Sequence, residues 1–367
     1  MVIFIDVRIG YILRKESIMK RTFTAIVTLV LIISALCVPA SAAETTFELP
    51  LAGTTGYGII DLGLRSGDSS KTEKLGTVPA GTVFTILEEG SSYFRMKLQD
   101  GNIGWVSKTY TMVNLPDLIP SIRYNATNSY SALYRSCGKE IPEVTGKAFY
   151  EGKTWNAKLG YEEFNVPVLY AMAKKIASAQ SAAMADGRTL VIYEGYRPLT
   201  VQQAVNKGLG ALMTADAAVN KAVAHSGWGK NWFIAKSVSN HQRGFAIDTS
   251  LAEVTSLEDV EIDGRTVKIP SSYTEFKMPT EMHELSPAVA SLAYGVDSKS
   301  ATAWKKVPMA GTMNDAAKLL RTYCTNAGMS PLASEWWHFN DLDARTATKA
   351  VGTGGFSIIN NVSAALG

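Results

Sequence analysis

The sequence predicts a small all-β barrel followed by a larger α+β domain. The chain has 367 residues, and at roughly 100 to 200 residues per domain this length indicates two domains. Short strand-like runs separated by turns fill residues 47–115, whereas helical periodicity beside short strands begins near residue 166. With 46% hydrophobic and 19% charged residues, the chain has the balance of a globular protein that buries a sizeable core.

Residues 1–42 have the features of a signal peptide. A basic start, Met19-Lys20-Arg21, precedes an apolar run over residues 23–38 and a small-residue segment at residues 39–43. We expect cleavage after Ala42, and Met19 is a candidate first residue because residues 1–18 do not resemble such a leader. The competing interpretation, an uncleaved membrane anchor, needs about 20 apolar residues, and this run is shorter. The expected location is therefore secreted, extracellular or cell-wall associated, with no stable membrane anchor after cleavage.

The net charge of +3 belongs to this leader. Five of the 36 basic and two of the 33 acidic residues lie in the first 42 positions, which leaves 31 of each in the body of the protein. A neutral body lacks the basic excess from which a nucleic-acid binder draws its affinity, so we expect no nucleic-acid partner. Cleavage also removes Cys37, and whether the two remaining cysteines, Cys137 and Cys324, form a disulfide stays open.

The predicted barrel, residues 43–115, consists of short strands separated by turns. The expected strands lie at residues 58–60, 62–67, 81–87, 93–98 and 104–106. The runs Leu62-Gly63-Leu64-Arg65-Ser66-Gly67 and Asp100-Gly101-Asn102-Ile103-Gly104-Trp105 resemble bacterial SH3-like domains. This resemblance implies cell-wall binding. A spacer barrel without a ligand is the alternative, because the matching positions are mainly turn glycines and core aliphatics.

Two prolines, Pro116 and Pro120, mark the predicted boundary of the second domain, residues 116–367. We expect a helix at residues 166–185, a strand at 189–193 and a helix at 314–327 that ends before Gly328. Residues 257–270 alternate around Asp263-Gly264, which is typical of an inserted hairpin. Helices beside short strands indicate the α+β class.

Two of the four histidines, His241 and His338, lie in informative segments. The first segment is Ser239-Asn240-His241-Gln242-Arg243-Gly244-Phe245-Ala246-Ile247-Asp248, and the second is Ser334-Glu335-Trp336-Trp337-His338-Phe339. Two imidazoles and one carboxylate suffice for a catalytic zinc ion, which takes three protein ligands and keeps one position open for water. A further carboxylate within reach of that water can act as general base, and Glu335 stands three residues before His338.

These segments resemble the zinc D-Ala-D-Ala peptidase family, which contains D,D-carboxypeptidases and D-Ala-D-Ala dipeptidases. The third matching motif, Glu194-Gly195-Tyr196-Arg197-Pro198, comes earlier in the chain with Gln202-Gln203 after it. Residues 118–124 and 278–281 also match, so the resemblance covers roughly residues 117–345 and favours the dipeptidase branch.

The resemblance implies a role for each motif residue. Arg197 would stabilise the oxyanion that develops on the scissile carbonyl, although an ion pair with Glu194 is the structural alternative. Gly244 would permit close backbone approach between the ligands of its motif, and Ser239 would bind substrate or support a ligand. His225 matches no family ligand. The zinc ligands would be His241, Asp248 and His338, for one ion per catalytic domain, and Glu335 would be the base.

The chain departs from the dipeptidase pattern at Met282-His283-Glu284, where dipeptidases usually carry Phe-Asp-Glu. Glu284 remains a candidate for binding the ammonium group of a dipeptide, but His283 removes one negative charge from that region. We therefore expect a secreted zinc peptidase that cleaves D-Ala-D-Ala in peptidoglycan stem peptides or as the free dipeptide. An endopeptidase for another stem or cross-bridge bond and a non-catalytic wall-binding module are the alternatives, and the oligomeric state is not predicted.

Overall fold

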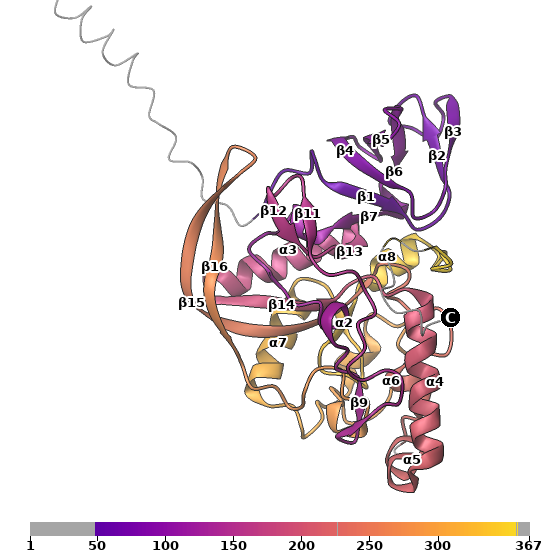
Figure 1. The fold of residues 1–367 in the computed structure, drawn as a ribbon, viewed down its shortest axis with the longest axis vertical. Helices are drawn as coiled ribbons and strands as arrows, with labels where there is room; N and C mark the ends of the chain where they lie inside the picture. Colours follow the sequence, from indigo (N-terminus) through magenta and orange to yellow (C-terminus); the bar gives the residue numbers. More distant parts are fainter. Residues whose placement is uncertain (1–47, 226, 357, 359–367) are drawn as a thin grey trace, which may run out of the picture. The chain divides into compact units, whose positions relative to one another are not determined.

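Two large sheets, one in each predicted domain, organise the described part of the chain (Figure 1). The computed structural model describes residues 48–225, 227–356 and 358. The predicted signal peptide and the first residues of the predicted barrel domain lie outside these ranges. Within the described residues, no helix combines the length and the apolar character that a membrane crossing requires.

The barrel domain is all-β, as predicted. Apolar side chains alternate with exposed ones along β4 and β5, where Phe84, Ile86, Phe94 and Met96 are buried. The first predicted strand, residues 58–60, is misplaced, because β1 runs from Thr55 to Gly58. Two further strands, β3 and β7, were not predicted. The strands are β1 (Thr55–Gly58), β2 (Leu62–Arg65), β3 (Lys74–Val78), β4 (Val83–Glu89), β5 (Tyr93–Leu98), β6 (Ile103–Ser107) and β7 (Thr111–Asn114).

The barrel sheet continues past the predicted boundary. Strand β13 (Pro167–Leu169), from the second domain, pairs antiparallel with β7, with Val168 opposite Val113. The sheet order is β13-β7-β1-β4-β5-β6-β2-β3. The predicted helix at residues 166–185 therefore begins only at Tyr170, because the residues before it extend this sheet. Barrel and second domain thus share hydrogen-bonded backbone.

The second sheet has the order β17-β18-β15-β14-β8, and β16 also pairs with β15. Only the β14–β8 pairing is parallel among these described strands. The predicted strand at residues 189–193 is confirmed as the centre of β14. The strands are β8 (Arg123–Tyr124), β14 (Arg188–Glu194), β15 (Ala246–Ile262), β16 (Arg265–Glu275), β17 (Ser330–Pro331) and β18 (His338–Asn340).

The predicted hairpin is confirmed as the outer half of β15 and β16 (Figure 1). Its two turn residues, Asp263 and Gly264, both have positive φ, at 51° and 70°. A two-residue turn of this kind matches the twist of the strands that it joins. Two smaller hairpins are formed by β9 (Arg135–Ser136) with β10 (Lys139–Glu140), and by β11 (Thr154–Asn156) with β12 (Tyr161–Glu163).

Helices α3 and α7 pack against each other, α3 on β14 and α7 on β15. In α7 the Asn314 side chain caps the first turn by accepting from the Ala317 amide at 3.0 Å, and Gly328 (φ 86°) follows the end, as predicted. The helices are α2 (Thr127–Tyr130), α3 (Tyr170–Ala185), α4 (Leu199–Ala215), α5 (Ala217–Ala224), α6 (Lys230–Phe233), α7 (Asp315–Asn326) and α8 (Leu342–Ala347). Short 3-10 helices are η1 (Lys108–Tyr110), η2 (Leu115–Asp117), η3 (Pro287–Val289) and η4 (Ala303–Lys306).

The disulfide question that the sequence left open is answered by the structure. Cys137 is exposed and Cys324 is buried, and both are free thiols.

Candidate active site

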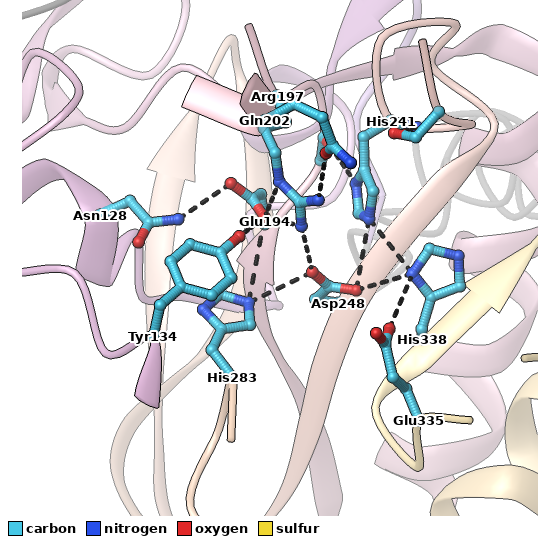
Figure 2. Close-up of polar contacts among 12 residues, drawn as sticks. Asn128, Tyr134, Glu194, Arg197, Gln202, His241, Asp248, His283, Glu335 and His338 are labelled. Carbon is cyan, nitrogen blue, oxygen red and sulfur yellow. Dashed lines mark hydrogen bonds and ion pairs between the residues drawn. The ribbon is translucent and has the colours of Figure 1, made fainter. Parts of the chain in front are cut away.

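Three neighbouring strands of the second sheet each contribute one side chain to the candidate site. Across β14 and β15 the register pairs Glu194 with Asp248, and across β15 and β18 it pairs Asp248 with His338. Directly opposite residues of paired strands point to the same face of a sheet, so these three side chains lie side by side (Figure 2). A register irregularity between Ile192 and Glu194 sets the position of Glu194.

Loops between the elements supply the other polar groups. Arg197 follows β14 and precedes α4, whereas His283 lies after β16. His241 stands in a turn before β15, closed by a hydrogen bond from the Gly244 amide to the His241 carbonyl at 3.0 Å. Glu335 lies in the loop before β18. The catalytic and metal-binding residues predicted from three separate motifs are therefore brought together.

Gly244 is required for a different reason from the predicted one. Its φ is +74°, and a Cβ atom there would lie 2.7 Å from Met112 Sδ and 3.0 Å from the Leu169 amide nitrogen. Met112 belongs to β7 and Leu169 to β13. The glycine thus permits close packing against the edge of the barrel sheet, and the prediction of close approach between the two ligands was wrong.

A cavity of about 190 Å³ lies at these groups. Its polar side chains come from strands β15 and β18, from helices α4 and α6 and from the loops between elements. Aromatic side chains, among them Trp232 and Trp337, form part of its wall. The cavity is lined by Tyr134, Arg197, Gln202, Asn231, Trp232, Phe233, Ile234, Ala235, Ser239, Asn240, His241, Asp248, His283, Leu285, Ser298, Leu332, Glu335, Trp337 and His338.

The donor atoms of the three predicted metal ligands converge. His241 Nε2 lies 3.2 Å from His338 Nδ1, and Asp248 Oδ1 lies 3.0 Å from His338 Nδ1 and 3.4 Å from His241 Nε2. Ligand bonds of about 2.0–2.1 Å in a tetrahedron place ligand atoms about 3.3 Å apart. The mutual distances of this triad therefore fit a tetrahedral ion such as zinc.

Hydrogen bonds at the far side of each ring orient both imidazoles for metal binding. His241 Nδ1 donates to the Gly195 carbonyl at 2.8 Å, and His338 Nε2 donates to Asn340 Oδ1 at 3.0 Å. The Asn340 oxygen also accepts from Asn240 Nδ2 at 2.7 Å, which fixes the amide. In the neutral rings the unprotonated nitrogens then face each other, an arrangement that a shared cation stabilises.

A second set of possible ligands, Glu194, Asp248 and His283, lies beside the first. His283 Nε2 is 3.2 Å from Asp248 Oδ2 and 3.9 Å from Glu194 Oε2. Arg197 bridges the two carboxylates, because its Nη2 donates to Asp248 Oδ2 at 2.9 Å and its Nε donates to Glu194 Oε2 at 2.7 Å. The guanidinium therefore already supplies the positive charge at this position.

The alternative interpretation of Arg197 is confirmed, since it forms a buried ion pair with Glu194. Its fifth N–H group nevertheless remains available for a ligand. Nε and Nη2 bind Glu194 and Asp248, and Nη1 donates one hydrogen to Gln202 Oε1 at 2.7 Å. The hydrogen bonds of the described residues thus use four of the five donor hydrogens, and the oxyanion role of Arg197 stays a prediction.

The buried charges shift one another's pKa values. For Asp248, burial raises the pKa, but contacts with His241, His283 and His338 hold it well below its ordinary value. Burial lowers the pKa of Arg197, but Glu194, Tyr134 and Asp248 raise it well above the ordinary value. Both groups therefore stay ionised, which keeps charge at the base of the cavity.

Glu335 has the opposite environment. Burial raises its pKa to about 8, with His338 opposing the change and Asp248 adding to it. Its Oε2 lies 3.7 Å from His338 Nδ1 (Figure 2), and Glu335 also lines the cavity. A carboxylate whose proton affinity is raised, and which stands beside a candidate metal ligand, is suited to accept a proton.

The two predicted substrate-binding residues differ in their positions. Ser239 lines the cavity, and its hydroxyl donates to Gln242 Oε1 at 2.8 Å. Glu284 does not line the cavity. Its carboxylate accepts from the backbone amides of Cys137 at 2.5 Å and Gly138 at 3.2 Å, in the turn between β9 and β10. This geometry turns Glu284 away from a substrate and gives it a structural task.

His283, the preceding residue, enters the site instead. Its ring stacks on Tyr134 with centroids 4.4 Å apart, and its exposure is 1%. A positive φ of 60° at His283 sends the two neighbouring side chains in different directions. The departure from the dipeptidase pattern was the sequence signal for this residue, but no pattern indicated that it would contact Asp248.

The pocket that holds Glu194 was also missed by sequence reasoning. Glu194 accepts from Asn128 at 2.9 Å, from Tyr134 at 3.1 Å and from Tyr150 at 2.5 Å, in addition to Arg197. Asn128 lies in α2 and the two tyrosines in loops, all far from β14 in sequence, and no short motif marks them. They fix the carboxylate that orients Arg197.

Comparison with known proteins decides the family. A family model described as D-Ala-D-Ala dipeptidase matches residues 153–352, which is more than half of the chain. The chain belongs to the D-Ala-D-Ala dipeptidase family. A second model, described as bacterial SH3 domain, matches residues 61–112 and confirms the barrel as SH3-like. No curated protein matches the sequence.

Two solved structures are similar to this chain. One is a mutant of the D,D-pentapeptidase VanY from a VanB-type resistance cassette, in complex with Zn(II). It is 16% identical, with a TM-score of 0.23 over 60% of this chain and 92% of the other. The second is VanYB in complex with D-alanine-D-alanine, 15% identical, with a TM-score of 0.24 over 60% and 91%.

Proposed function

We propose that the protein is an exported, zinc-dependent D,D-peptidase that hydrolyses the D-Ala-D-Ala bond of peptidoglycan stem peptides or of the free dipeptide. The observation that carries the proposal is the meeting of three metal-ligand donors, Arg197 and Glu335 at one cavity. A non-catalytic binding module has no use for a buried carboxylate of raised proton affinity beside an open metal position.

His241 Nε2, Asp248 Oδ1 and His338 Nδ1 would hold one zinc ion. When bound, zinc supplies Lewis acidity toward a carbonyl oxygen and lowers the pKa of water. The hydrogen bonds from His241 to Gly195 and from His338 to Asn340 preorganise the two rings, so that metal binding requires little rearrangement.

Glu335 performs the proton transfers. Its carboxylate takes a proton from the attacking water and returns it to the nitrogen of the departing D-Ala, as one residue of fixed position serves first as base and then as acid. Arg197 presents its remaining Nη1 hydrogen to the oxygen that becomes negative on the scissile carbonyl. Because Glu194 and Gln202 hold the guanidinium in place, this donor needs no reorganisation during the reaction.

Export and wall attachment are part of the proposal. The leader-like segment in residues 19–43 supports export, since a basic start, an apolar run and small residues follow in order. The SH3-like barrel supports attachment to peptidoglycan, where stem peptides carry the proposed substrate. Fractionation of cells, with the mature N-terminus sequenced, tests cleavage after Ala42.

The decisive experiment measures release of D-Ala by the mature chain from a muropeptide pentapeptide, after chelation and after zinc is added back. Restored activity at one zinc ion per chain is expected. Glu335→Gln should lower turnover by about 10²–10⁴-fold with zinc content unchanged. Glu162→Gln, an exposed acid on β12, is the matched control. Undiminished turnover of Glu335→Gln, or zinc bound without the triad, would refute the mechanism.

Mass spectrometry of the products separates this function from the endopeptidase alternative. A D,D-peptidase releases a single D-Ala from the pentapeptide, whereas cleavage of another stem or cross-bridge bond gives larger peptide fragments. If only larger peptide fragments appeared, the enzyme would cleave a stem or cross-bridge bond other than D-Ala-D-Ala.

A further inference from the structure

The position of the substrate amine is fixed by the chemistry of the proposed reaction. In free D-Ala-D-Ala the charged amine sits on the residue that bears the scissile carbonyl, about 2.5 Å from the carbonyl carbon. It must therefore enter the same cavity as the carbonyl. In a longer stem peptide the same nitrogen is a neutral amide. A site that accepts the free dipeptide needs a carboxylate for this ammonium group.

The described part of the chain places only two carboxylates in the cavity lining, Asp248 and Glu335. Both oxygens of Asp248 are engaged. Oδ1 faces the two metal-ligand histidines, and Oδ2 accepts from Arg197 at 2.9 Å and faces His283 Nε2 at 3.2 Å. An ammonium paired with Glu335 would occupy the group that must take the proton from water.

The carboxylates behind the cavity wall are equally engaged. Glu194 accepts from Arg197 and from three neutral side chains, and it carries a pKa below its ordinary value despite burial, chiefly because of Arg197. Glu284 is held by two backbone amides in the turn between β9 and β10.

His283 lines the cavity between Tyr134 and Asp248 (Figure 2). Its ring is buried on Tyr134, with Nε2 directed at Asp248 Oδ2 and, at 3.9 Å, toward Glu194. A donor thus stands where a carboxylate would be needed. Together with Arg197 and a bound metal ion, it makes this part of the cavity unfavourable for a second cation.

We infer that the cavity selects substrates whose penultimate D-Ala nitrogen is acylated, so that the enzyme acts as a carboxypeptidase on peptides and discriminates against the free dipeptide. This inference rests on the proposed D,D-peptidase function and assigns its substrate class. His283 acts as the specificity-determining residue, because it replaces the counter-ion that a dipeptide would require.

The test compares D-Ala-D-Ala with N-acetyl-D-Ala-D-Ala, a pair that differs in the amine, with the zinc-loaded full chain and released D-Ala as the readout. We expect kcat/KM to be at least tenfold higher for the acetylated substrate at pH 7. Equal values, or a preference for the free dipeptide, would overturn the inference and leave the proposed function intact. No release from either substrate or from the muropeptide pentapeptide would refute both.

The pH dependence of this ratio identifies the charge as the cause. The dipeptide amine has a pKa near 8, so its neutral fraction rises about tenfold between pH 7 and pH 9. The preference for the acetylated substrate should shrink by up to about that factor. A ratio that stays constant with pH would show that size, not charge, decides, and would overturn the inference.

Variants of His283 supply a second, independent arm. His283→Asp introduces a carboxylate and should lower the preference at least fivefold, chiefly through KM for the dipeptide. His283→Asn, similar in size but uncharged, is the matched control and should retain the preference. If both variants shifted the ratio equally, charge at residue 283 would not be the determinant. If His283→Asp failed to fold, the comparison of substrates with the native chain would still decide.

Discussion

Replacement of Gly244 by alanine should destabilise the protein strongly, although the change adds one methyl group. The left-handed backbone at φ +74° costs an alanine about 1–2 kcal/mol. The new Cβ would also lie 2.7 Å from Met112 Sδ and 3.0 Å from the Leu169 nitrogen. Relief of such overpacking costs about 1–3 kcal/mol more, because the backbone nitrogen cannot rotate away. The expected loss is about 2–5 kcal/mol of the free energy of unfolding, measured by urea denaturation.

Gly187→Ala is the matched control. Gly187 has φ +72°, and a Cβ atom there would meet nothing within 4 Å, so this change carries the backbone cost alone. The difference between the two variants isolates the clash. Adding Met112→Ala to Gly244→Ala should restore part of it, which a double-mutant cycle measures. If Gly244→Ala were no more destabilising than Gly187→Ala, the contact of a Cβ atom at residue 244 with β7 and β13 would not cost the expected free energy of unfolding.

Three further predictions concern Asn340, Lys158 and the two free cysteines. Asn340→Leu removes the acceptor of His338 Nε2 and should weaken zinc binding about 10–100-fold in a chelator competition, whereas Asn340→Asp should not. Burial lowers the pKa of Lys158 to about 8 from an ordinary value of 10.5, so the unfolded chain holds this proton more tightly. Stability should therefore rise between pH 8 and 10.5, by at most about 3 kcal/mol relative to Lys158→Met, and an equal pH slope in both proteins would contradict this. Ellman's reagent should label Cys137 in the folded protein and Cys324 only after unfolding, because Cys324 is buried. Rapid labelling of both cysteines in the folded protein would contradict the burial of Cys324.

The three candidate metal ligands could be predicted because their motifs resemble those of the zinc D-Ala-D-Ala peptidase family. His241 and Asp248 lie seven residues apart around one turn, and the register of β15 with β18 places Asp248 opposite His338. Spacing alone does not link His338 to the other two residues, since it lies 90 positions after Asp248. The hairpin at Asp263 is different, because two turn residues and alternating flanks specify its pairing locally.

His283 and the residues around Glu194 could not be predicted, because tertiary contacts alone bring them to the site. His283 and Glu284 are neighbours in sequence, and a positive φ at a non-glycine residue decides which of them enters the cavity. Such a backbone conformation is sparsely populated and is held by its surroundings. The predicted start of α3 was wrong for a related reason. Helical periodicity was present before Tyr170, but pairing with β7 outweighed it.

Shared backbone joins the SH3-like barrel and the domain that carries the candidate site into one scaffold. Strand β13 extends the barrel sheet, and the amide of Leu169, its last residue, donates to the Gly244 carbonyl at 2.7 Å. Gly244 in turn closes the turn that carries His241. A displacement of β7 would therefore reach a candidate metal ligand through three consecutive backbone contacts. The glycine between the candidate ligands His241 and Asp248 thus packs at the junction with the barrel sheet.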